Sequence, residues 1–238
     1  MTSKFDYIIA GGGSAGCALA YRLAKNSSAS VCLVEAGGHG RDLFIKMPAG
    51  NGFVFGNPKL DWGYSSIPQK ELNNRQIYFA RGKALGGSSI VNGMIYMRGI
   101  ASDYDNWRQM GLNGWSYSDL LPYFKRSEGS LNRQDQYHGN HGPLKVEPAR
   151  NFGKLDKAFI KAALQSGHNF LEDFNGPVRT GVSRVDSTVH KGIRQSSALA
   201  YLKKIPKNLH IFTNTHISRI LFEHTRAVGI ESTKGDKF

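Results

Sequence analysis

A glycine-rich loop between an apolar segment and a helical segment constrains the fold more than any other part of this sequence. The loop at residues 11–16 follows the apolar run 5–10, and residues 17–24 carry apolar side chains at helical spacing. Residues 30–35 then predict a second strand, which ends in Glu35. A strand, a GxGxxG loop, a helix and a second strand ending in an acid form the βαβ unit that binds dinucleotides. We therefore expect an α/β fold of Rossmann type, with residues 5–10 as a buried parallel strand.

Each glycine of this motif has a physical task. Gly11 allows the tight turn from strand to helix, Gly13 leaves room for a pyrophosphate, and Gly16 lets the helix pack closely on the strand. The helix N-terminus directs N–H groups and a partial positive charge at the phosphates. Glu35 is expected to accept hydrogen bonds from ribose hydroxyls. The sequence therefore predicts a dinucleotide site at the start of the chain.

A second glycine-rich segment, residues 82–99, is of a different kind. Gly86 and Gly87 lack a Cβ atom and can adopt backbone conformations closed to other residues. Ser88 and Ser89 add hydroxyl donors and acceptors. One glycine loop is a weak signal, but two loops of different kinds indicate a single extended cofactor that is contacted at both ends.

The second segment extends into a longer pattern of small residues, a lysine, paired glycines, small polar residues, an asparagine, an aromatic residue and a distal acid. The residues that carry it are Gly82, Lys83, Gly86, Gly87, Ser88, Ser89, Asn92, Tyr96 and Asp105. With this pattern the sequence resembles the glucose–methanol–choline (GMC) oxidoreductases, a family of flavoenzymes. Segments 34–38, 192–196 and 208–231 also resemble the family, so that the resemblance covers nearly the whole chain.

The resemblance implies FAD as the cofactor. Its ADP half would lie on the first loop and Glu35, its pyrophosphate and flavin ring along residues 85–94, and its adenine at the backbone of Ile217. Some family members bind FAD covalently through a histidine at the position of Val91; valine has no nucleophilic atom, so we expect non-covalent FAD. The predicted cofactor-binding residues are Gly11, Gly13, Ser14, Ala15, Gly16, Glu35, Ala36, Leu85, Gly86, Gly87, Ser88, Asn92, Gly93, Met94 and Ile217.

The family's reaction, as the resemblance implies it, oxidises a primary alcohol to an aldehyde by hydride transfer to flavin N5. The electron acceptor is O2 or another oxidant, and a histidine near the C-terminus of the full-length enzymes removes the hydroxyl proton. None of the eight histidines here has a matching context, and there is no Ser-Pro dipeptide to begin the family's second signature. We therefore assign no catalytic residue, and expect an N-terminal portion that is inactive alone and holds FAD weakly.

Two other functions remain open from the residues alone. An NAD(P)-dependent dehydrogenase would explain residues 11–16 and Glu35, but it leaves residues 82–105 unexplained. A non-catalytic nucleotide-binding fragment would explain the absence of a catalytic base. The particular alcohol and the oligomeric state are not encoded in any pattern of the sequence.

The pattern of elements predicts two domains. We expect residues 1–143 to form the first segment of an incomplete FAD-binding domain, residues 144–195 part of an inserted α+β substrate domain, and residues 196–238 the continuation of the FAD-binding domain. Residues 144–147 predict an edge strand and residues 155–167 an amphipathic helix. Within the helix-rich segment 103–128, the aromatic residues expected to be in the core are Trp107, Trp115, Tyr123 and Phe124.

The composition excludes several other classes of protein. The formal net charge is +13, but the nearest basic cluster, Lys203, Lys204 and Lys207, is too short for a nucleic-acid site. His138 and His141 are three positions apart outside any predicted helix and have no set of carboxylates nearby, so no metal site is expected. Cys17 and Cys32 are expected to be small buried residues. No apolar run is long enough to span a membrane and a strand begins by Tyr7, so we expect a cytoplasmic protein without a signal peptide.

Overall fold

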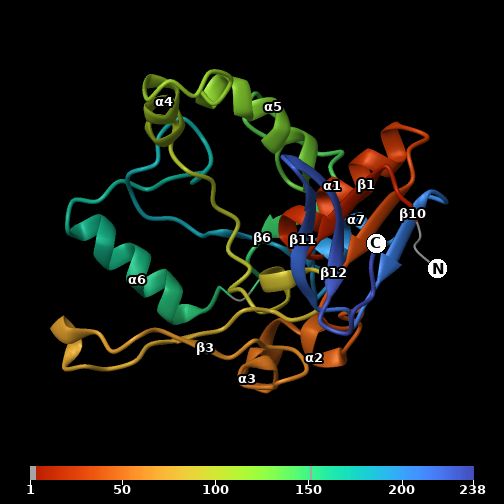
Figure 1. The fold of residues 1–238 in the computed structure, drawn as a ribbon. Coiled ribbons are helices and arrows are strands. Elements are labelled where there is room, and N and C mark those ends of the chain that lie inside the picture. The colour runs from red at the N-terminus through yellow and green to blue at the C-terminus, as the bar shows by residue number, and fades with distance from the viewer. Residues whose placement is uncertain (1–3, 151) are drawn as a thin grey trace. The chain divides into compact units, whose positions relative to one another are not determined.

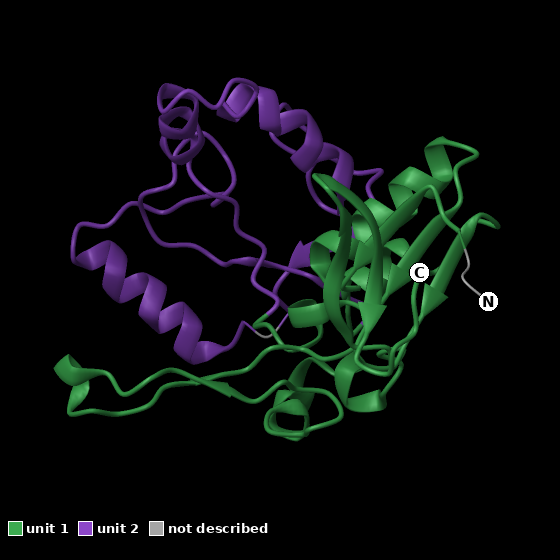
Figure 2. Cartoon of the chain, viewed as in Figure 1, with its two compact units in different colours: residues 1–93, 192–238 green, residues 94–191 purple. Residues whose placement is uncertain are grey.

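The computed structural model describes residues 4–150 and 152–238. These fall into two compact units (Figure 2), residues 1–93 with 192–238 and residues 94–191. The second unit begins at Met94 and thus includes the helix-rich segment 103–128, which the sequence had grouped with the FAD-binding domain. The functional division of the chain into cofactor and substrate domains stays a prediction.

A three-stranded parallel sheet forms the centre of the first unit. Strand β2 (Val31–Val34) lies between β1 (Tyr7–Ala10) and β10 (Leu209–Phe212), as Figure 1 shows. Helix α1 (Ser14–Asn26) connects β1 to β2 and packs against α7 (Ser197–Tyr201). The buried core between sheet and helices consists of Ala20, Ala24, Val31, Leu33, Leu85 and Leu209. The predicted βαβ unit is therefore present, with α1 running from the glycine-rich loop.

Strand β1 is less buried than the sequence predicts. Tyr7 is 48% exposed, and every residue of β1 is exposed or only half-buried. Within the described residues β1 pairs with β2 alone, so its other edge carries no neighbouring strand. By contrast, every residue of the central strand β2 is buried. An apolar run predicts a buried strand only where both neighbours are present, which a local pattern does not record.

The segment between β2 and the second glycine-rich loop contains only short elements. Its helices and strands are α2 (Leu43–Lys46), α3 (Asn51–Val54), β3 (Tyr64–Ser65) and β4 (Tyr78–Phe79), with 3₁₀ turns at Pro48–Gly50 and Lys70–Leu72. A further 3₁₀ turn follows at Gly87–Ile90. The antiparallel hairpin of β11 (Ile217–Glu223) and β12 (Arg226–Ser232) completes the first unit.

Asp61 holds this irregular segment together. Its carboxylate is 3% exposed and accepts N–H groups from Gly56, Gly63 and Arg81 at 2.9–3.1 Å, and the hydroxyl of Tyr78. Burial alone would raise the pKa of Asp61, but these hydrogen bonds outweigh burial and lower it. A single ionised carboxylate thus fixes the loop that precedes the second glycine-rich segment.

The described residues of the second unit form a small sheet and three helices. Strand β6 (Leu144–Pro148) pairs in parallel with β5 (Glu128–Ser130) and antiparallel with β7 (Asp186–Ser187). It is therefore the middle strand, not the edge strand that its alternating pattern predicts. The helices are α4 (Ala101–Gln109), α5 (Tyr117–Ser127) and α6 (Lys154–Gln165). Strand β8 (Val189–His190) also belongs to this unit, whereas β9 (Ile193–Arg194) belongs to the first unit.

The aromatic residues predicted to fill the core of the helical segment are largely exposed. Trp107 is 41%, Trp115 is 48% and Tyr123 is 61% exposed, whereas Phe124 is half-buried. The two tryptophan rings contact each other instead, edge to face at 5.8 Å between centroids. No described element of this unit covers their outer faces. The core prediction is wrong here because an aromatic pattern does not specify what packs against it.

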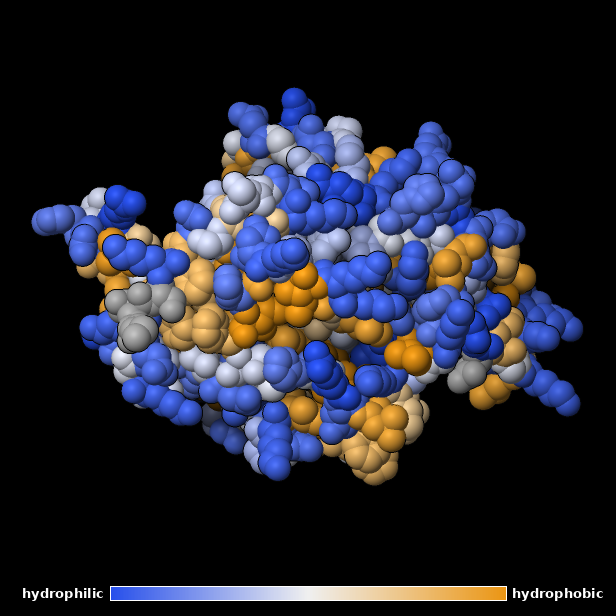
Figure 3. Space-filling model, turned by 90° about the vertical axis from the view of Figure 1, so that its right-hand side faces the viewer, coloured by the Kyte–Doolittle hydropathy of each residue, from blue (hydrophilic) through white to orange (hydrophobic). Residues whose placement is uncertain are grey.

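Large apolar side chains are exposed in both units. Phe222 on β11 is 60% exposed and Leu155 on α6 is 83% exposed. On the face drawn in Figure 3, hydrophobic side chains lie among predominantly hydrophilic ones. None of the described helices is both long enough and apolar enough to cross a membrane.

Candidate functional site

The two glycine-rich loops of the first unit lie against each other. The N–H of Gly86 donates to the carbonyl oxygen of Gly12 at 2.7 Å. A Cβ atom on Gly87, whose φ is +50°, would lie 2.6 Å from Cα of Gly13. The sequence predicted contacts at opposite ends of a cofactor, and the structure joins both loops into one surface. Only glycine allows backbones to approach so closely.

No side chain caps the start of α1, and open space lies beside Gly13. Helix α1 begins at Ser14, and neither a capping side chain nor an acidic residue occupies its first turn. A Cβ atom on Gly13 would meet no atom within 4 Å, whereas one on Gly16 would overlap the carbonyl oxygen of Gly11. Gly16 therefore serves packing, and Gly13 borders vacant space. A helix N-terminus with that space in front of it fits a diphosphate.

Glu35 joins the first loop to the turn after β2. The residue is 6% exposed, and its two carboxylate oxygens accept the N–H groups of Gly12 and Gly37, each at 2.8 Å. This structural task was not foreseen from the sequence. Since each carboxylate oxygen has a second lone pair, Glu35 keeps acceptor capacity for a ribose hydroxyl.

A cavity of about 340 Å³ opens beside Glu35. The indole of Trp62 lies on one side of it, with His216 edge to face at 5.2 Å and the ammonium of Lys83 at 4.9 Å from the ring centroid. Aromatic walls with a carboxylate suit a nucleoside. The lining residues are Ala10, Gly11, Val34, Glu35, Ala36, Trp62, Gly82, Thr215, His216 and Ile217.

The other residues of the second glycine-rich segment have differing surroundings. The hydroxyl of Ser89 accepts the N–H of Ser197 at 2.9 Å, which ties the Gly87–Ile90 turn to the start of α7. Leu85 is buried in the core below this turn. Gly93 borders open space, since a Cβ atom there would meet nothing within 4 Å. Met94, with φ +61°, is the first residue of the second unit.

The side chain of Arg194 binds Asn92 and so holds the end of the second glycine-rich segment in place. From the sequence, no role was assigned to Arg194. Its guanidinium donates to the backbone oxygen and to Oδ1 of Asn92, at 2.7 and 3.0 Å, and to Oδ1 of Asn51 at 2.5 Å. The side chain is 2% exposed, and burial lowers its pKa. The one signal in the sequence was an arginine inside the 192–196 motif. A contact with a residue about 100 positions earlier in the chain leaves no local pattern.

In the second unit, His138 lies between two carboxylates that the sequence did not place near it. Nδ1 is 2.8 Å from Oε1 of Glu128, and Nε2 is 2.8 Å from Oδ2 of Asp173. Glu128 also pairs with Arg98 at 2.6 Å. Burial alone would lower the pKa of His138, but the hydrogen bonds to Asp173 and Glu128 outweigh it and raise the pKa to about 9. The imidazole is thus a buried cation with both nitrogens occupied.

This arrangement does not match a metal site. The two carboxylates bind opposite nitrogens of one ring, so they do not converge on a common point. Among the residues that the structure describes, no cluster of His, Cys, Asp and Glu has the geometry of a metal site.

The two cysteines are buried, as expected, and do not form a disulfide. Burial raises the pKa of the Cys17 thiol to about 11 and that of Cys32 to about 12. Cys17 Sγ donates to the carbonyl oxygen of Gly12 at 3.0 Å. Both thiols therefore stay protonated near neutral pH and are not nucleophiles.

Comparison with known proteins identifies the family of this chain. The family model for GMC oxidoreductases matches residues 5–238. Oxygen-dependent choline dehydrogenases from Rhizobium etli and from Brucella suis are each 42% identical over 98% of this chain. The crystal structure of pyridoxine 4-oxidase from Mesorbium loti superposes on 98% of the chain with TM-score 0.92 and 35% identity. An FAD-dependent oxidoreductase from Chaetomium thermophilum superposes on 96% with TM-score 0.87 and 29% identity.

The matched proteins are longer than this chain. It spans 42–43% of the two choline dehydrogenases, 47% of the pyridoxine 4-oxidase and 42% of the Chaetomium thermophilum protein. The similarity therefore concerns less than half of each of these proteins.

Proposed function

Since the chain belongs to the GMC oxidoreductase family, we propose that its first unit binds FAD and serves the oxidation of a primary alcohol to an aldehyde. The observation that carries this proposal is the joined surface of the two glycine loops, with vacant space in front of Gly13. When bound, FAD would supply the hydride acceptor for this oxidation. This chain's residues bind and orient the cofactor.

Each part of FAD has a matching group in the first unit. The start of α1 and Gly13 would hold the pyrophosphate, Glu35 the ribose, and the cavity with Trp62 and Ile217 the adenine. The segment 85–93 would lie along the pyrophosphate and flavin ring, with its Asn92 end fixed by Arg194. In this arrangement the backbone presents most of the donors, so little of the protein rearranges on binding.

We propose that the flavin is held without a covalent bond. Val91, at the position that carries a flavin-bonded histidine in some family members, is 5% exposed and packs with Ile45, Val54, Ala84 and Ile90. An aliphatic side chain in an apolar cluster offers no atom for a bond to the cofactor.

The substrate is proposed to be a small primary alcohol, with O2 or another oxidant as the final electron acceptor. Matched relatives are named for choline and pyridoxine oxidation. No residue of this chain is proposed as the base that removes the hydroxyl proton.

Titration of the purified chain with FAD tests the proposal. A bound flavin shows an absorbance band near 450 nm (roughly, a general flavin property) that co-elutes with the protein. We expect Gly13→Ala to weaken FAD binding about tenfold or more, because its Cβ fills the space for the pyrophosphate. Gly52→Ala is the matched control, since its Cβ also meets no atom within 4 Å but lies in α3.

Three outcomes would contradict parts of this proposal. Equal FAD affinity of the Gly13→Ala and Gly52→Ala variants would contradict the proposal that the pyrophosphate lies at Gly13. Binding of NADP or NAD in preference to FAD would favour the dehydrogenase alternative. Flavin that stays in the protein pellet after acid precipitation would contradict non-covalent binding.

A further inference from the structure

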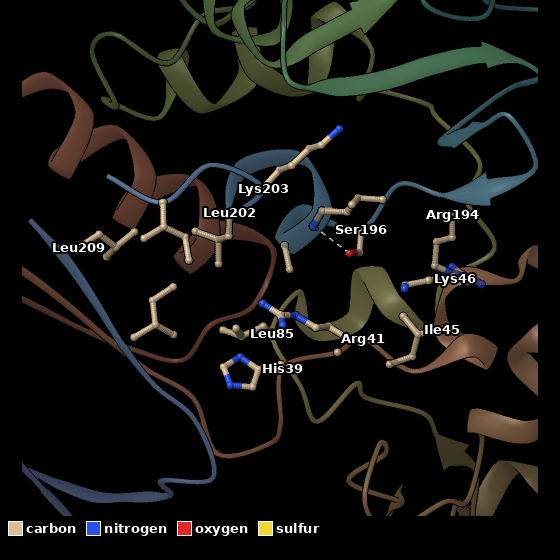
Figure 4. Close-up of a pocket in the computed structure, with 15 residues that line it drawn as sticks. His39, Arg41, Ile45, Lys46, Leu85, Arg194, Ser196, Leu202, Lys203 and Leu209 are labelled. Carbon is tan, nitrogen blue, oxygen red and sulfur yellow. Dashed lines mark hydrogen bonds between the residues drawn. The ribbon is translucent and has the colours of Figure 1, made fainter. Parts of the chain in front are cut away.

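A second cavity in the first unit shares no lining residue with the nucleotide cavity. Its volume is about 420 Å³, and it lies among the loop that leads to α2, helix α7 and strand β10. Figure 4 shows its side chains. The nucleotide cavity is lined by residues of β1, the end of β2 and the start of β11. The second cavity thus lies apart from the nucleotide cavity, although Leu85 in its wall begins the segment proposed to lie along the pyrophosphate and flavin ring.

One end of this cavity is apolar. Figure 4 places Leu202 and Leu209 at that end and Leu85 towards the middle. The apolar residues of its wall that come from α7 and its flanks are Ala198, Leu199, Leu202 and Ile205. An open apolar wall of this kind gains free energy when a hydrocarbon group covers it.

The other end carries positive charge with no acid to balance it. Arg194 and Lys46 lie at that end, and Arg41 extends into the middle of the view. Lys203 and the imidazole of His39 also line the cavity, but no aspartate or glutamate does. Within the described part of the chain, none of the four Lys and Arg side chains forms an ion pair.

The surroundings of Arg194 are a second, independent observation that favours an anion at the charged end of the cavity. Its side chain is 2% exposed, and its Nε, which is itself buried, has no hydrogen-bond partner among the described residues. The groups that it does contact, Asn92 and Asn51, are neutral. A buried cation that has only neutral partners is costly, and an anion nearby offsets that cost.

We propose that this cavity binds an organic carboxylate with an apolar body, such as a medium-chain fatty acid. The carboxylate would lie at the end formed by Lys46 and Arg194, and the chain would extend along Leu85 and Leu202 towards Leu209. An inorganic anion would leave the apolar wall exposed, and an uncharged lipid would leave the cations unpaired. The carboxylate with a hydrocarbon tail satisfies both ends.

Calorimetric titration of the chain with sodium octanoate tests this proposal, with octanol as the uncharged probe of the same length. We expect one octanoate per chain and weaker binding of octanol. Lys46→Gln and Arg41→Gln should each weaken octanoate binding roughly threefold to fivefold, since each removes one partly exposed charge. Lys207→Gln is the matched charge control, because Lys207 is exposed and lies outside the cavity.

The apolar end is tested with a second pair of variants. Ile205→Gln, in the wall, should weaken octanoate binding, and Ile220→Gln on β11 should leave it unchanged; the two side chains are 51% and 53% exposed. All of these positions are exposed, so circular dichroism should show folded variants.

Competition with FAD separates this site from the nucleotide site. We expect octanoate to bind equally with and without FAD, whether or not the proposed flavin function is correct. Displacement of FAD by octanoate would assign the binding to the nucleotide cavity and overturn the proposal. Equal binding of octanol, or octanoate binding that none of the cavity variants changes, would overturn it as well.

Discussion

The two glycine-rich loops of the first unit form one surface, the glycine surface, and the second unit contains a buried cluster of charged side chains. These two regions hold the chain together by different kinds of contact. Both join segments that are far apart in the sequence. The first unit does so with backbone contacts, such as Gly86 N–H to the oxygen of Gly12 at 2.7 Å. The second does so with side chains, through Arg98, Glu128, His138 and Asp173.

The difference shows which region is free to bind a ligand. Backbone contacts between glycines leave the N–H groups at the start of α1 and the space before Gly13 available. In the second unit, both nitrogens of His138 and both oxygens of Glu128 are already occupied. The charged cluster therefore stabilises its unit, and the uncharged surface is the better candidate for a binding site.

The largest expected effect comes from the charged cluster. Glu128→Gln would remove the fully buried carboxylate that pairs with both Arg98 and His138. We expect the free energy of unfolding to fall by about 3–5 kcal/mol, as for other broken buried ion pairs. Urea titration followed by circular dichroism measures this change.

Glu231→Gln is the control for this substitution. Its partner Arg219 is 66% exposed at the side chain, and such surface pairs contribute about 1 kcal/mol or less. If both substitutions cost the same, the cluster does not hold the second unit and the comparison fails.

The change in the free energy of unfolding with pH should be nearly as large as the loss expected for Glu128→Gln. The pKa of His138 is about 9 in the folded chain, above the value of about 6.5 for an unperturbed histidine. The folded state thus gains stability from the bound proton, fully below pH ~6.5, and loses it as the pH rises through about 9; the loss is on the order of 3 kcal/mol. Urea midpoints between pH 6 and 10 (roughly the window that linkage defines) measure it. His138→Gln should flatten the alkaline slope.

A backbone substitution tests the glycine surface. Gly16→Ala places a methyl group against the carbonyl oxygen of Gly11, and neither backbone segment can move without separating α1 from its loop. We expect the chain to lose about 2–3 kcal/mol of stability, as for other overpacked sites. Thermal melts measure it against Gly52→Ala, which meets no neighbour and should change stability by about 1 kcal/mol or less.

Sequence patterns predicted the parts of this fold that depend on neighbours along the chain. The loop at 11–16 with its flanking elements, the helix at 155–167 and the strands after residue 208 all lie close to their predicted positions. Each depends on local spacing, on a glycine such as Gly167 with φ +87°, or on a capping residue.

Contacts between distant segments could not be predicted in this way. Glu128 and Asp173 are 10 and 35 positions from His138, and Asn92 is 102 positions from Arg194. The prediction of which residues are buried was wrong at Tyr7 and Trp107 for the same reason, since burial depends on what packs against each residue. The role of Glu35 in binding Gly12 and Gly37 could not be predicted either, because the sequence indicates only that Glu35 ends a strand.

The smallest expected effect comes from Glu35→Gln, the same substitution as at Glu128 but in the uncharged region. Glu35 binds two neutral N–H groups, so the change costs one hydrogen bond and leaves no buried charge unpaired. We expect a loss of about 1–2 kcal/mol in urea titration, clearly less than at Glu128. FAD affinity should fall as well, since an amide NH2 would face the ribose or Gly12. A loss of stability as large as that of Glu128→Gln would mean that a single carboxylate, and not the close approach of glycines, holds the two loops together.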